Sequence, residues 1–107
     1  MNSPWVDERS PAIFVPMRTV RLRIAGKVQG VGYRAWAIRV AVSLTLRGWV
    51  RNRGDGTVEL LATGDDDAVA TMIETCRRGP SDARVDLIDI LEAEDPGDTG
   101  FTARQTA

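Results

Sequence analysis

The stretch "KVQGVGYR", residues 27 to 34, marks a change of hydrophobic period that constrains the fold more than any other feature of the chain. Before it, Val20, Leu22 and Ile24 alternate with polar residues, as they would in a strand with one buried face. After it, apolar residues recur at helical spacing from Tyr33 to Leu44. The sequence therefore predicts a strand, a glycine-rich turn and an amphipathic helix in direct succession.

The next part of the chain predicts a hairpin and a second helix. The runs "LRGWVRN" and "RGDGTVELLATG" read as two antiparallel strands, because a Gly-Asp-Gly cluster between them is typical of a hairpin turn. In "GDDDAVATMIETCRRGP", aspartates suit a helix start, two arginines suit the last turn, and Gly-Pro ends the pattern. The predicted buried face of this helix consists of Val69, Met72, Ile73 and Cys76.

The last third of the chain predicts one more strand and a short closing strand. The alternation in "ARVDLIDILEAE" slips between Leu87 and Ile88, which indicates either a bulge there or two partly buried faces. A polar turn at 96–100 leads to a short strand at 101–104. The order is strand, helix, strand, strand, helix, strand. It predicts an α+β fold, the ferredoxin-like split βαβ sandwich, with an antiparallel sheet and two helices on one face.

Length and composition bound the class of protein. A chain of 107 residues with 43% hydrophobic and 27% charged residues suits one globular domain, and it has no apolar run long enough to cross a membrane. Residues 1–16 hold three of the five prolines and follow neither period, so we expect a flexible extension before a domain at 17–107. This N-terminus also lacks the pattern of a secretory signal, which favours a cytoplasmic location.

The residue inventory narrows the possible chemistry. The chain has no histidine and a single cysteine, Cys76, so the usual metal-ligand clusters and Ser-His or Cys-His pairs are unavailable. We therefore expect neither a metal nor a cofactor. The charge is uneven: residues 1 to 53 carry ten bases and two acids, whereas the remainder carries four bases and thirteen acids. This asymmetry indicates either an anion-binding face or an ordinary charged surface that the fold interleaves.

A glycine-rich turn between a strand and a helix is a candidate phosphate site. Such a turn gathers backbone N–H groups at the positive end of a helix, and Arg34 in the first helical turn could clamp the same phosphate. A tight connection without any ligand is the simpler interpretation. The segment "GVGYRA" also satisfies a dinucleotide-binding pattern, but that site needs parallel strands, and the second strand here turns straight back.

Two separated motifs support a third interpretation. The stretch "GKVQGVGYR", the asparagine of "GWVRNRGDGTVE" eighteen positions after Arg34, and the later "GP" and "ARV" closely resemble the acylphosphatase family. The resemblance extends from Met17 to the C-terminus. It implies a metal-independent hydrolase that splits the carboxyl-phosphate bond of acyl phosphates without a covalent intermediate. The catalytic arginine and asparagine of the family map onto Arg34 and Asn52. The phosphate-binding loop maps onto Gln29, Gly30, Val31, Gly32, Tyr33 and Arg34.

Two residues depart from the family pattern, and one other function stays open. Tyr33 stands where phenylalanine is common, so its hydroxyl needs a partner. Thr45 stands where glycine is frequent, and a left-handed conformation there would cost on the order of 1 kcal/mol or more. The alternative function is a non-catalytic module that binds a phosphorylated ligand, nucleic acid or protein, in which Asn52 is only a turn residue. We expect a monomer acting on a small acyl phosphate, with nucleic acid an improbable partner.

Overall fold

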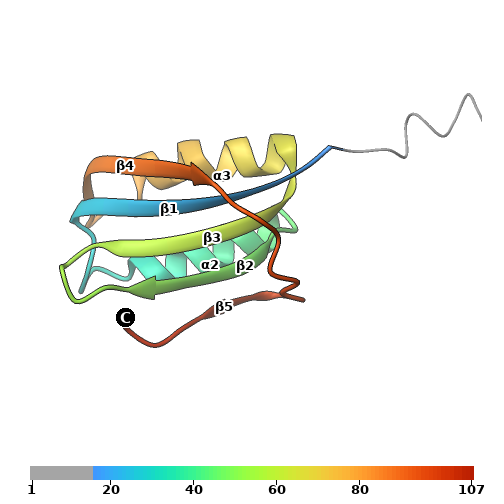
Figure 1. Cartoon of the computed structure of the whole chain (residues 1–107). Helices are drawn as coiled ribbons and strands as arrows, with labels where there is room; N and C mark the ends of the chain where they lie inside the picture. Colours follow the sequence, from blue (N-terminus) through green and yellow to red (C-terminus); the bar gives the residue numbers. More distant parts are fainter. Residues whose placement is uncertain (1–15) are drawn as a thin grey trace, which may run out of the picture.

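The computed structural model describes residues 16–107, and it contains two helices and five strands in that range (Figure 1). The predicted order of elements is confirmed, including the short closing strand. Residues 1–15 of the predicted N-terminal extension lie outside the described residues. The elements are β1 (Met17–Lys27), α2 (Tyr33–Ser43), β2 (Arg47–Asn52), β3 (Val58–Asp65), α3 (Asp66–Arg78), β4 (Arg84–Glu92) and β5 (Phe101–Ala103).

The strands form one sheet in the order β4-β1-β3-β2-β5. Neighbouring strands among β4, β1, β3 and β2 are antiparallel, as predicted, whereas β5 runs parallel to β2 and makes the sheet mixed. The reason is topological. After β4 the chain reverses direction and crosses to the far edge of the sheet, where β2 already runs the same way. Figure 1 shows this connection passing over the face of the sheet that carries no helix.

The hydrophobic core lies between the sheet and the two helices. Val20, Leu22 and Ile24 of β1 are completely buried on the helix side, which confirms the period-two prediction. The predicted buried face of α3, from Val69 to Cys76, is also confirmed. Helix α2 lies over β2 and β5, and α3 lies over β3, β1 and β4. Within the described part of the chain, no helix has the length and apolar character needed to span a membrane.

The irregularity predicted in β4 exists, but its predicted position was wrong. Ala25 pairs with Leu87 and Gly26 pairs with Val85, so the register shifts at Asp86 and not between Leu87 and Ile88. Beyond the shift Ile88 is buried and Leu87 is exposed, as alternation requires. The extra residue falls opposite Gly26, where the backbone adopts a φ of 131° that a side chain rarely tolerates.

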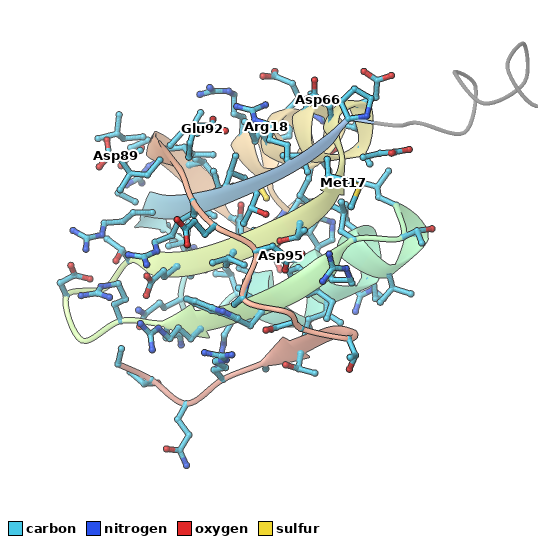
Figure 2. The ribbon with its side chains drawn as sticks, turned by 45° about the vertical axis from the view of Figure 1, so that its right-hand side comes forward. Met17, Arg18, Asp66, Asp89, Glu92 and Asp95 are labelled. Atoms are coloured by element: carbon cyan, nitrogen blue, oxygen red, sulfur yellow. The ribbon has the colours of Figure 1, made fainter. Side chains whose placement is uncertain are left out.

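The topology interleaves the basic and acidic halves of the chain at one end of the sheet. Figure 2 shows Arg18 on β1 beside Glu92 at the end of β4 and Asp66 at the start of α3. The Arg18 guanidinium lies 2.7 Å from the Glu92 carboxylate and 3.8 Å from that of Asp66. Arg47 likewise pairs with Asp95 at 2.6 Å. Part of the charge asymmetry is therefore neutralised by ordinary surface ion pairs.

Candidate active site

The connection between β1 and α2 has the backbone geometry of an anion-binding loop. Gly30 and Gly32 have φ values of 75° and 79°, and Gly32 is the N-cap residue of α2. A Cβ added at either position would meet no atom within 4 Å, so the positive φ, and not lack of space, is what requires glycine. The same open space leaves the loop accessible to a ligand.

The N–H groups of this loop are available for a ligand. In the described part of the chain, the main-chain N–H groups of residues 29–34 donate no hydrogen bond to another protein group, and α2 has no side-chain cap. The first turn of α2 also contains no acidic residue. Unpaired N–H groups at the positive end of a helix form a site for an anion.

Arg34 supplies the only charge that the loop brings to this site. It lies in the first turn of α2, is exposed, and takes part in no ion pair with the residues that the structure describes. Its guanidinium is therefore free to bind an anion in a bidentate manner.

Asn52, the last residue of β2, lines the same pocket as Arg34. The pocket has a volume of about 380 Å³. The glycine-rich loop contributes Gly30, Gly32, Tyr33 and Arg34 to its lining. The remaining lining residues are apolar, and none of them is acidic. The buried Asn52 Oδ1 has no hydrogen-bond partner among the described residues, so it can accept a hydrogen bond from a molecule in the pocket.

The main chain of Asn52 is fixed from two sides. Asn52 pairs with Val58 in the hairpin of β2 and β3. The Ala107 N–H donates to the Asn52 carbonyl at 3.0 Å, and the Gly54 N–H donates to the Ala107 carbonyl at 2.9 Å. Figure 1 shows the β1 to α2 connection, the β2 to β3 hairpin and the C-terminus at the same end of the sheet.

Gln29 has a role that the sequence did not predict. Its side-chain amide donates to the carbonyls of Arg53 and Thr57, both at 2.8 Å, and so fastens the loop to the hairpin beside Asn52. Neither Gln29 nor Val31 lines the pocket, and the Val31 side chain packs against the core. Of the predicted phosphate-binding residues, these two can contribute only their main-chain N–H groups.

The side chain of Tyr33 is buried, so this residue too could reach a ligand only through its main chain. Its hydroxyl donates to the Cys76 carbonyl in the last turn of α3 at 2.7 Å, which supplies the partner that the hydroxyl needs. The ring contacts Trp36 edge to face, with ring centroids 5.2 Å apart. Burial raises the pKa of the Tyr33 hydroxyl, and its contact with Cys76 adds to this effect, so the phenol stays neutral.

Comparison with known proteins decides the family. A family model described as acylphosphatase matches residues 20–103, most of the chain. The chain belongs to the acylphosphatase family. An acylphosphatase from Rhodospirillum rubrum is 49% identical over 88 residues, which cover 82% of this chain and 97% of that protein. The expectation of a hydrolase acting on acyl phosphates is thus confirmed at the level of the family.

Solved structures support the fold of this acylphosphatase family member. An acylphosphatase from Bacillus subtilis superposes with a TM-score of 0.79 and 33% identity, covering 83% of this chain and 99% of that one. A full-length HypF structure superposes with a TM-score of 0.80 at 23% identity, covering 87% of this chain but 12% of that chain. The second likeness concerns the fold alone. The predicted ferredoxin-like sandwich is confirmed.

Proposed function

We propose that this protein hydrolyses acyl phosphates, with the phosphate held by the N–H groups of residues 29–34 and by Arg34, and with Asn52 orienting the attacking water. One observation carries the proposal. A single pocket contains the glycine loop with its unpaired N–H groups, the free Arg34 guanidinium and the unpartnered Asn52 Oδ1. An anion and a water molecule are the two reactants that this set of groups suits.

The reaction needs little more than these groups. The carboxylate released from an acyl phosphate is a good leaving group, so the protein does not have to supply a strong general acid. Its tasks are to hold the phosphoryl group in place and to stabilise the charge on its oxygens. The N–H groups and the guanidinium perform both tasks.

Asn52 acts on the water in this proposal. Its Oδ1 accepts a hydrogen bond from the water, and its amide nitrogen can donate one, so the side chain aims the water oxygen at phosphorus opposite the leaving carboxylate. The amide cannot take the proton that the water loses. A phosphate oxygen of the substrate accepts it, and inorganic phosphate and a carboxylate leave.

The independence from metal and cofactor stays a prediction. The described residues hold no group of three or more histidine, cysteine, aspartate or glutamate side chains that could bind a metal ion. The monomeric state, the cytoplasmic location and the division into an extension at 1–16 and a domain at 17–107 likewise stay predictions.

Hydrolysis of a synthetic acyl phosphate in the presence of EDTA tests the proposal. The wild type should turn over, and Arg34→Ala and Asn52→Ala should each lose roughly 10²- to 10³-fold in kcat/KM. Arg34→Ala should also lose affinity for inorganic phosphate, whereas Asn52→Ala should keep that affinity and lose turnover.

Arg39→Ala is the matched control, because Arg39 is an exposed arginine of α2 outside the pocket lining. It should retain the wild-type rate. Robust hydrolysis by either pocket variant would contradict the assigned roles. Phosphate binding by a wild type that never turns over would instead favour the non-catalytic alternative.

A further inference from the structure

A second hollow lies on the face of the sheet that carries no helix. Because side chains alternate along a strand, Val50 and Asn52 lie on the helix side, and Arg51 and Arg53 lie on the open side. The hollow has a volume of about 580 Å³. Its lining consists of Arg21, Arg23, Arg51, Arg53, Glu59, Trp49 and residues 89–91 of β4. It shares no lining residue with the pocket of Arg34 and Asn52.

One carboxylate holds three of the arginines in this hollow. The Glu59 side chain is only 5% exposed. Its Oε1 accepts hydrogen bonds from Arg51 Nε at 2.7 Å and Arg53 Nη1 at 2.9 Å. Its Oε2 lies 3.6 Å from Arg21 Nε. The single negative charge cannot neutralise three guanidinium groups, so the cluster keeps an excess of positive charge.

Some N–H donors of these arginines have no acceptor in the part of the chain that the structure describes. Arg51 is bound to Glu59 through Nε and Arg53 through Nη1, which leaves both terminal nitrogens of Arg51 and Nη2 of Arg53 without an acceptor among the described residues. Arg53 Nε is buried and has no partner in that range. Arg23 takes part in no ion pair with the residues that the structure describes.

Arg51 is also held in place before any ligand arrives. The Arg51 guanidinium lies over the Trp49 ring, 4.8 Å from its centroid, in addition to its hydrogen bond with Glu59. Fixed guanidinium groups lose little freedom when they bind an anion. Four arginines and two carboxylates, Glu59 and Asp89, line the hollow, so the charge it offers matches an anion with at least two negative charges.

We propose that this hollow is a second anion site, which binds a small anion with two or more negative charges, such as a phosphate compound or a polycarboxylate. The ligand bridges Arg23 and the free terminal nitrogens of Arg51 and Arg53. The site is separate from the loop of residues 29–34 and lies on the other side of the sheet.

A two-dimensional amide NMR titration of the full chain tests the site. Inorganic pyrophosphate and citrate are titrated separately, so that the two arms distinguish phosphate from carboxylate ligands, and the amides of residues 29–34 and 52 report binding to the glycine loop. The expected result is saturable shifts of the amides of residues 21, 23, 51, 53 and 59 in at least one arm. Shifts confined to residues 29–34 and 52 would overturn the proposal.

Arg23→Gln tests the charge requirement, with Arg39→Gln on the outer surface of α2 as the matched control. Both residues are exposed and in no ion pair with the described residues, so both variants should fold. Arg23→Gln should weaken binding roughly tenfold, and Arg39→Gln should leave it unchanged. Equal effects of the two variants would overturn the proposal. So would a single-stranded RNA that shifts the same amides at far lower concentration than either small anion.

Discussion

Thr45 ends helix α2 in a conformation that favours glycine. Its φ is 59°. The main-chain hydrogen bonds around it are those of a Schellman motif, since the Thr45 N–H donates to the Val42 carbonyl and the Leu46 N–H donates to the Ala41 carbonyl. The family resemblance raised the possibility of this strain, because glycine is frequent in the family at the position of Thr45, and the φ of Thr45 confirms the left-handed conformation. The strain affects the end of a helix and not the pocket.

Thr45→Gly should therefore stabilise the protein. A left-handed conformation costs a residue with a side chain about 1–2 kcal/mol, and glycine removes this cost from the folded state. Glycine also has more conformational freedom in the unfolded chain, which reduces the net increase in stability. We expect the free energy of unfolding, measured with urea, to rise by about 0.5–1 kcal/mol. Ser43→Gly in the last turn of the same helix is the control, and it should lower this free energy. An equal decrease in the free energy of unfolding in Thr45→Gly and Ser43→Gly would contradict the strain at Thr45.

Glu59 should make stability depend on pH. Burial by itself raises the pKa of its carboxyl, but the hydrogen bonds and charges of Arg51 and Arg53 outweigh burial and hold that pKa below its usual range. The stabilisation is thus complete above the pKa of about 4.3 of an ordinary glutamate, and it is lost as pH falls through the lower folded value.

Glu59→Gln should lower the free energy of unfolding by about 1–3 kcal/mol at pH 7, because it leaves the arginines without their counter-charge, although they are partly exposed. The difference from the wild type should shrink as pH falls below about 4. Urea unfolding at several pH values measures it. Glu94→Gln, which removes an exposed glutamate outside the ion pairs of the described residues, should show little difference at any pH. A decrease in the free energy of unfolding that is the same at every pH would contradict the ionic role of Glu59.

At the scale of elements, Gln29 connects the glycine loop to the hairpin that ends beside Asn52. Gln29→Ala removes two hydrogen bonds and should let the two halves of the pocket move relative to each other. We expect kcat/KM for an acyl phosphate to fall roughly tenfold, mainly through kcat, because orientation is what the hydrogen bonds supply.

Gln29→Glu gives a sharper version of this test. The side chain keeps its shape but at neutral pH can no longer donate to the Arg53 and Thr57 carbonyls. The kcat/KM of Gln29→Glu should fall at least as far as that of Gln29→Ala. Gln105→Ala, an exposed glutamine without such bonds, should behave as the wild type. Wild-type turnover in Gln29→Ala would show that the loop and the hairpin are held together without this side chain.

The elements themselves followed from the sequence more completely than their junctions. Both helices and all five strands were predicted, because a change of hydrophobic period and a glycine or proline are local signals. The position of the bulge in β4 was missed by one or two residues, since it depends on which residue of β1 lies opposite. The parallel pairing of β5 was also missed, since an edge strand of three residues carries no signal for its direction.

At the scale of the whole molecule, Cys76 reports on the integrity of the fold. It is completely buried on α3, and burial raises the pKa of its thiol to about 11, an effect that the nearby Tyr33 hydroxyl opposes only in part. At pH 8 the native thiol should therefore react with a disulfide reagent only when the protein unfolds, far more slowly than in guanidinium chloride.

The matched control for this reaction moves the thiol to the surface. In Cys76→Ala combined with Thr71→Cys, the thiol is on an exposed position of the same helix and should react at the rate of a free thiol. Stopped-flow or manual absorbance measurements give both rates. Rapid reaction of native Cys76 would show that the packing around α3 opens without global unfolding.

The sequence by itself determined the local features of this protein: the strand, loop and helix around Gly30 and Gly32, with Arg34 in the first helical turn. Its resemblance to a known family added Asn52 and Thr45. Local conformation depends on sterics between neighbours in the chain, so a sequence displays it directly. Only the tertiary structure decided the partners at long range. These partners include the hydrogen bonds from Gln29 to the hairpin and from Tyr33 to the Cys76 carbonyl. They also include the hydrogen bond from Ala107 to the Asn52 carbonyl and the arginines around Glu59. Such partners depend on strand register, which determines both the face of each side chain and the residue opposite.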